Sequence, residues 1–166
     1  MRQDADSPSL DRIDRAIMVA LQQDARITNK DLAARVGLAE SSCLERVRRL
    51  TRTGVLRGFH AEVDLRAIGV GLQALVSVRL ARHTRKAFGA FRKSMLGLEH
   101  AIAVFHVAGS NDFLVHVAVR DSDALRELIL DRFTSRPEVA HVETSLIYEH
   151  ARNVRFGERG GGSDSG

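Results

Sequence analysis

The stretch from Ile27 to Leu56 constrains the fold most, because its apolar residues have the spacing of two short helices joined by a tight turn. Thr28 can cap the first helix, with Asp31 three residues later as in a capping box. Gly37 can end that helix at a positive φ, and Gly54 can end the second. The two apolar stripes comprise Leu32, Ala33 and Val36, then Cys43, Leu44, Val47 and Leu50. This pattern predicts a helix-turn-helix.

The second of these helices is basic on its polar side. Residues 41–60 carry five arginines and one acid. Arginine fits phosphate and guanine with two parallel hydrogen bonds, so we expect double-stranded DNA as a partner. We expect Arg46 and Arg49 to be main DNA contacts, with Ser41, Ser42 and Glu45 near base edges. The expected DNA-binding residues are Ser41, Ser42, Glu45, Arg46, Arg48, Arg49 and Arg52. A solvated face on an ordinary helical hairpin is the alternative, and the placement of the charge favours DNA.

Length and composition fit this interpretation. The 166 residues suffice for one large domain or two small ones, and the formal net charge of +4 suits nucleic acid. The one cysteine, Cys43, lies on an apolar stripe and cannot form an internal disulfide, which fits a reducing cytoplasm. No apolar run is long enough to span a membrane, and residues 1–9 lack the apolar centre of a signal peptide, so we expect no membrane partner.

A third helix is predicted ahead of these two, completing a helical domain over residues 10–64. Asp11 can cap it, with Asp14 three residues later. Its apolar face comprises Leu10, Ile13, Ile17 and Leu21. After Gly54, apolar residues alternate with more polar ones, which predicts a strand that is either a wing or a linker. The alternating residues are Val55, Phe59, Ala61 and Val63. We place the domain boundary within residues 65–71.

The second half has a different rhythm, which predicts a ferredoxin-like βαββαβ domain over residues 70–152. We expect strands at 72–80, 101–107, 113–119 and 139–148, and helices at 84–96 and from Asp121 or Ser122 to Pro137. Both helices would cover one face of an antiparallel sheet, so the fold class is α+β. The other sheet face is partly apolar and has no cover in the chain, which predicts a second copy as partner. Residues 1–9 and 157–166 are predicted to be disordered tails.

A helix-turn-helix followed by a ferredoxin-like domain resembles the Lrp/AsnC family of transcriptional regulators, also known as leucine-responsive or feast/famine regulators. The resemblance covers roughly residues 10–152. It is carried by LDRIDRAI from Leu10, DARITNKDLAARVGL from Asp24, CLERVRRL from Cys43, GVLRGF from Gly54 and GSNDF from Gly109. It implies a bacterial or archaeal regulator whose second domain senses an amino acid or a related metabolite. It also implies homodimers that assemble into tetramers or octamers.

The resemblance further implies an effector site, which in this family lies between dimers and uses the turn between the second and third sensor strands. Here that turn is Gly109, Ser110, Asn111 and Asp112. A glycine lets the backbone present N–H groups to a ligand carboxylate. Asp112 can either accept from an ammonium group or hold the turn by a side-chain hydrogen bond. Thr144 and Leu146 on the last strand are expected as walls, because the outer strands should lie near this turn.

Two departures from the family pattern bear on these sites. The family often has an acid and an aromatic at the positions of Ser110 and Asn111, so the ligand class is left open. It also often has Ser-Pro at the start of the recognition helix, where this chain has Ala39-Glu40. Ser42 with Glu45 offers a replacement capping box, which predicts that the helix begins later.

Other chemistry has little support in the sequence. His106 and His116 lie on adjacent predicted strands and could sit near each other, but no histidine has metal-site spacing with a second strong ligand, so we expect no metal and no cofactor. The chain has no Walker loop, nucleophile elbow or paired carboxylates, so we expect no enzyme. Two functions remain. The first is a sequence-specific regulator that responds to an amino acid, and the second is an architectural DNA-binding protein without an effector.

Overall fold

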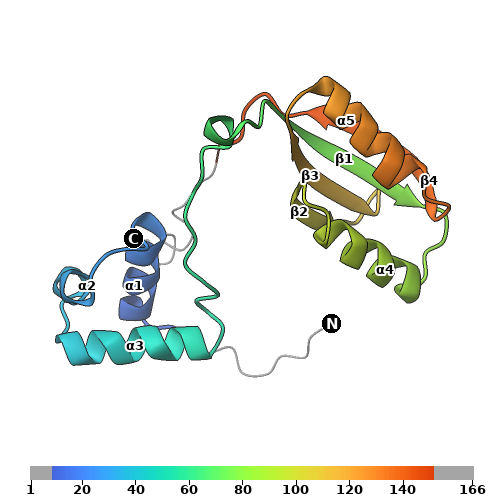
Figure 1. Ribbon diagram of the computed structural model, residues 1–166. Helices are drawn as coiled ribbons and strands as arrows, with labels where there is room; N and C mark the ends of the chain where they lie inside the picture. The colour runs from blue at the N-terminus through green and yellow to red at the C-terminus, as the bar shows by residue number, and fades with distance from the viewer. Residues whose placement is uncertain (1–8, 152–166) are drawn as a thin grey trace, which may run out of the picture. The chain divides into compact units, whose positions relative to one another are not determined.

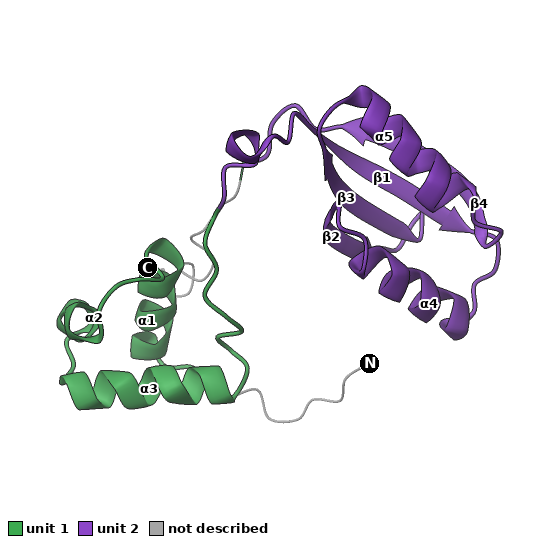
Figure 2. Ribbon diagram, in the orientation of Figure 1, with its two compact units in different colours: residues 1–62, 151–166 green, residues 63–150 purple. Residues whose placement is uncertain are grey.

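The computed structural model describes residues 9–151 of the chain. It divides into two compact units, residues 1–62 with 151–166 and residues 63–150 (Figure 2). The tails predicted for residues 1–9 and 157–166 lie outside the described residues, except for Ser9. Within the described part of the chain, no helix is both long and apolar enough to cross a membrane.

The first unit contains three helices, α1 (Arg12–Gln23), α2 (Asn29–Val36) and α3 (Glu40–Arg52) (Figure 1). The cap predictions at α1 and α2 are confirmed. Asp11 and Asp14 form a reciprocal capping box, and Thr28 accepts from the backbone N–H of Asp31. Gly37 ends α2 with a φ of 71°, a left-handed conformation that favours glycine. The buried apolar residues of this core are Ile17, Ala20, Leu21, Leu32, Ala33, Cys43 and Leu50.

Two predictions about this unit are wrong. Helix α3 begins at Glu40, with Ala39 as an N-cap that makes no side-chain bond, so Ser42 and Glu45 do not form a cap. The turn after Gly37 is short, and the first helical bond already runs from Cys43 N–H to the Ala39 carbonyl. The strand predicted over 55–63 is also absent, because residues 57–64 belong to neither helix nor strand. A strand needs a neighbour for its backbone groups, and no described strand pairs with this segment.

The second unit is a four-stranded antiparallel sheet in the order β2-β3-β1-β4, with α4 and α5 on the same face (Figure 1). This confirms the ferredoxin-like α+β prediction. Its elements are η1 (Arg66–Ile68), β1 (Leu72–Leu80), α4 (Arg85–Leu96), β2 (Ala101–His106), β3 (Phe113–Val119), α5 (Ser122–Ile129), the π-helical turn η2 (Leu130–Thr134) and β4 (Val139–Leu146). Thr84 and Asp121 cap α4 and α5 through their side chains.

The two faces of the sheet differ in cover. Alternate residues of β1 and β3 pack with Phe91, Met95, Leu125, Leu128 and Phe133 from the helical side to form the second core. The register places a different set on the other side, here termed the open face: Leu75, Ser77, Ala103, Phe105, Leu114, His116, Ala118 and Glu143. Phe105 is 50% exposed there. The sequence suggested that the chain leaves this face without cover. The structure shows one contact there, because the His150 ring lies 6.0 Å from the ring of His116.

Candidate DNA-binding helix and effector turn

The outward face of α3 is polar and accessible. Ser41, Glu45, Arg48 and Arg52 follow one another at helical spacing and are all exposed, while Cys43 and its apolar stripe face the core. The helix is 13 residues long, enough to lie along a segment of a DNA groove. It therefore presents two cations, a hydroxyl and a carboxylate in the arrangement expected of a recognition helix.

Arg46 and Arg49 occupy a different side of α3, next to α1. One guanidinium nitrogen of Arg46 lies 2.9 Å from a carboxylate oxygen of Asp14 and 2.6 Å from one of Asp11. Arg49 contacts the other Asp14 oxygen at 2.5 Å. The Asp14 side chain is 1% exposed, so its charge is buried and paired with two guanidinium groups. This network ties α1 to α3 and gives both arginines a structural partner.

The electrostatics of Asp14 follow from these contacts. Burial raises the pKa of its carboxyl group, but the hydrogen bonds from Arg49 and Arg46 outweigh burial and hold the pKa below its usual value. The pKa of Asp11 is also lowered, first by the Asp14 backbone N–H and then by Arg46. Sequence reasoning assigned Asp14 only to a helix cap and missed this role. The signal was an acid three residues before Ile17, on the same face of the helix as the apolar stripe.

The remaining two arginines of α3 are unpaired within the described residues. Arg48 and Arg52 are exposed and take part in no ion pair there. The positive charge that α3 offers to solvent is therefore concentrated on its outward face, while part of the charge of Arg46 and Arg49 is neutralised from within the unit.

The turn between β2 and β3 is held by Asp112. Its carboxylate accepts from the backbone N–H of Leu80 at 2.8 Å and lies 3.2 Å from Nε2 of His83. The backbone N–H of Asp112 also donates to the Val78 carbonyl at 2.9 Å. The Asp112 side chain thus has a structural partner at the end of β1, and its contact with an effector stays a prediction. Gly109 has a φ of 137°, which side chains rarely adopt, and Ser110 beside it is exposed.

Thr144 and Leu146 do not lie beside this turn within one chain. Strand β1 separates β4 from β3, and the register places Thr144 opposite Val76 and Leu146 opposite Ala74, away from the turn. The expectation that they flank it in the same chain is wrong, because β4 occupies the far edge of the sheet. Leu146 instead lines a separate cavity of about 240 Å³ with residues of the segment that follows β4.

Aromatic side chains gather next to the turn on the helix-covered face. The His106 ring stacks on Phe113 at 5.0 Å and lies 4.8 Å from Phe88, which in turn is 5.9 Å from His83. His116 lies on the open face, where its ring is hydrogen-bonded to Gln73 at 2.9 Å. The sequence suggested that His106 and His116 could sit near each other, but they lie on opposite faces of the sheet. The described residues contain no group of three His, Cys, Asp or Glu side chains that could hold a metal ion.

The fold combines a three-helix unit that contains a helix-turn-helix with a ferredoxin-like unit, and both match known domains. Residues 10–51 match the AsnC-type helix-turn-helix domain, and residues 73–153 match the Lrp/AsnC ligand binding domain. The chain belongs to the Lrp/AsnC family of transcriptional regulators. Its function is thus transcriptional regulation through DNA, with a domain for a small-molecule effector, and not catalysis.

Three similar proteins place it within that family. The HTH-type transcriptional regulator AldR of Mycolicibacterium smegmatis is 43% identical over 91% of this chain and 88% of its own length. The leucine-responsive regulatory protein of Escherichia coli is 36% identical over 86% and 87%. A transcriptional regulator of Neisseria meningitidis, solved as a complex with L-Met, superposes with a TM-score of 0.80 at 28% identity, covering 87% of this chain and 94% of that one.

Proposed function

We propose that the chain binds specific DNA sequences through α3 and changes its DNA affinity when an amino acid binds to its second unit. The observation that carries the DNA part is the exposed stripe on α3, where Arg48 and Arg52 are unpaired among described residues. Ser41, Ser42, Glu45, Arg46 and Arg49 complete the proposed contact set. Arg46 and Arg49 have free guanidinium nitrogens beyond those that bond Asp11 and Asp14.

The DNA contacts are tested by Arg48→Ala, with Arg126→Ala on α5 as a matched exposed control. A phosphate contact predicts weaker binding to all sequences and a salt-dependence slope lower by about one. A guanine contact predicts a loss of ~1–3 kcal/mol that is confined to the cognate sequence. Fluorescence anisotropy across a salt series separates these results. Equal DNA affinity in wild type, Arg48→Ala and Arg52→Ala proteins, with folding intact, would contradict the assignment.

The effector is proposed to be a small amino acid or a close metabolite bound at Gly109, Ser110, Asn111 and Asp112. Support comes from the positive φ of Gly109 and from the complex of the Neisseria relative with L-Met. Backbone N–H groups at such a turn can meet a ligand carboxylate. Since Thr144 and Leu146 lie away from the turn in one chain, they take part in this proposal only as residues contributed by a neighbouring chain.

A homodimer formed through the open face is the proposed basic unit, with assembly into a tetramer or octamer. The support is the apolar surface of Leu75, Phe105 and Leu114, which the chain itself leaves accessible in part. A dimer of helix-turn-helix units also suits two DNA half-sites about one helical turn, ~34 Å, apart.

A further inference from the structure

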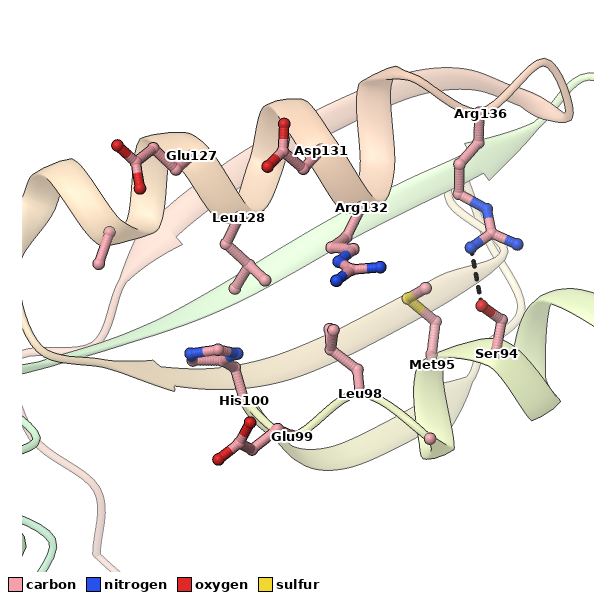
Figure 3. Close-up of a pocket in the computed structure, with 12 residues that line it drawn as sticks. Ser94, Met95, Leu98, Glu99, His100, Glu127, Leu128, Asp131, Arg132 and Arg136 are labelled. Carbon is pink, nitrogen blue, oxygen red and sulfur yellow. Dashed lines mark hydrogen bonds between the residues drawn. The ribbon is translucent and has the colours of Figure 1, made fainter.

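A cavity of about 590 Å³ lies on the helix-covered side of the second unit, between the end of α4 and the segment α5–η2 (Figure 3). None of the four residues of the Gly109–Asp112 turn lines it. Its volume falls in the range of small-molecule sites, ~300–1,000 Å³. Neither the proposed DNA contacts on α3 nor the proposed effector turn includes this cavity, so we consider what its lining could bind.

The interior of this cavity combines an apolar floor with one cation. Figure 3 shows Leu128 and Arg132 projecting from α5–η2 into the gap, toward Leu98 and Met95 on the α4 side. Met95 is 1% and Leu128 7% exposed, so the floor is anchored in the core. Glu127 and Asp131 extend from the opposite side of the helix (Figure 3). The charged group of α5–η2 that faces the gap is therefore a guanidinium.

Arg132 is exposed, and the residue of η2 that packs into the core is Phe133, five residues after Leu128. The Arg132 guanidinium places a positive charge at the solvent-accessible side of the cavity. Arg132 forms no hydrogen bond or ion pair with a described residue. Arg132 lies in the π-helical turn η2. Such turns are rare in proteins, and those that occur are often found at functional sites.

The far end of the cavity is held rigidly by a different arginine. Arg136 donates from Nη1 to Ser94 Oγ at 2.7 Å and from Nε to Glu138 Oε1 at 2.8 Å, and its guanidinium lies 5.5 Å from the Phe91 ring centre. Its charge is already compensated, so it shapes the cavity without offering a free cation. A ligand would find one unpaired cation, Arg132, above a preformed apolar surface.

We propose that this cavity binds a small monocarboxylate with an apolar body. The carboxylate would pair with the Arg132 guanidinium in a two-bond fork, and the body would rest on Met95, Leu98 and Leu128. Amino acids and 2-oxo acids share this chemistry and differ in the α-substituent. The carboxylate of Glu99, on the other side of the cavity, would attract an α-ammonium group. Binding of such a ligand in this cavity would give the regulator a second effector site, separate from the Gly109–Asp112 turn.

The test is calorimetric titration of the full chain with L-leucine, 4-methyl-2-oxopentanoate and 3-methylbutylamine. We expect at least one of the two acids to bind and the amine, which lacks a carboxylate, not to bind. Arg132→Met should weaken acid binding at least about tenfold. Arg126→Met is the matched control, because Arg126 is an exposed arginine of α5 that does not line the cavity. Its one ion pair, with Asp123, is long at 3.9 Å. This control variant should leave binding unchanged.

Two further variants keep the result interpretable. Leu98→Trp fills the cavity from the α4 side and leaves the arginine at position 132 in place, so it should also abolish acid binding. Thermal unfolding verifies that each variant folds. Preferential binding of L-leucine would assign the ligand as an amino acid, and preferential binding of the oxo acid would assign a 2-oxo acid. The proposal is overturned if no acid binds, or if Asp112→Ala removes all acid binding while Arg132→Met and Leu98→Trp leave it intact.

Discussion

At the residue scale, the buried carboxylate of Asp14 fixes two arginines of the proposed DNA-binding helix to α1. It accepts from Arg46 and Arg49 on α3 while capping its own helix α1 with Asp11. The orientation of the recognition helix therefore rests partly on one acid in a different helix. Counting charges along α3 finds four arginines but cannot show that two of them point toward a buried acid. That limit arises because ion pairing depends on tertiary placement, which helical spacing in one segment does not encode.

Asp14→Asn should destabilise the first unit by about 1–3 kcal/mol, because it replaces a doubly bonded anion by a neutral amide while the two guanidinium groups stay partly solvated. Chemical denaturation measures this loss. Asp11→Asn is the control, since the Asp11 side chain is 50% exposed and asparagine caps helices equally well. A loss as large in Asp11→Asn as in Asp14→Asn would contradict the importance of burial.

The same carboxylate predicts the direction of the pH dependence. The folded pKa of Asp14 is lowered, so the unfolded state binds more protons around the ordinary aspartate pKa of about 3.9. The contribution is complete above that value and is lost as the pH falls through the folded pKa. The difference in stability between wild type and Asp14→Asn should therefore be constant near neutral pH and shrink in acid.

At the scale of elements, periodicity predicted most boundaries well. The expected strands 72–80 and 113–119 coincide with β1 and β3, because strict alternation marks strands covered on one face. The strand expected over 55–63 also alternates, yet it lacks a partner among the described residues. Alternation reports which side chains can be buried but not whether another strand is present. The misplaced Thr144 and Leu146 have a similar cause, since strand order in the sheet is a long-range property.

The β2–β3 turn shows what local sequence can and cannot predict. The positive φ of Gly109, 137°, follows from turn chemistry that is read over a few residues. The reach of Asp112 to Leu80 of β1 and to His83 depends on which strand lies next to β3. The cavity at Arg132 was missed for the same reason, because its lining comes from two helices that the chain separates by two strands.

At the scale of the whole molecule, we expect the open face to govern the proposed assembly. Phe105→Glu should convert the proposed dimer to a monomer, because it places a charge on the apolar part of that face next to Leu114. Light scattering coupled to size-exclusion chromatography measures the change. Leu96→Glu is the control, because Leu96 is 56% exposed on α4, outside the open face. A monomeric wild type, or a Phe105→Glu protein with unchanged mass, would contradict this assembly.

The central claim is that an amino acid bound to the second unit changes how the first unit binds DNA. The most direct measurement is the DNA affinity of the full chain, by anisotropy at fixed salt, without and with each of the twenty amino acids at millimolar concentration, on a DNA selected by the protein from a random pool. We predict that at least one amino acid shifts the Kd by about fivefold or more, a coupling of ~1 kcal/mol. Gly109→Trp should abolish that shift while leaving the Kd without amino acid unchanged. Tight DNA binding that no amino acid alters would contradict the claim and favour an architectural DNA-binding protein.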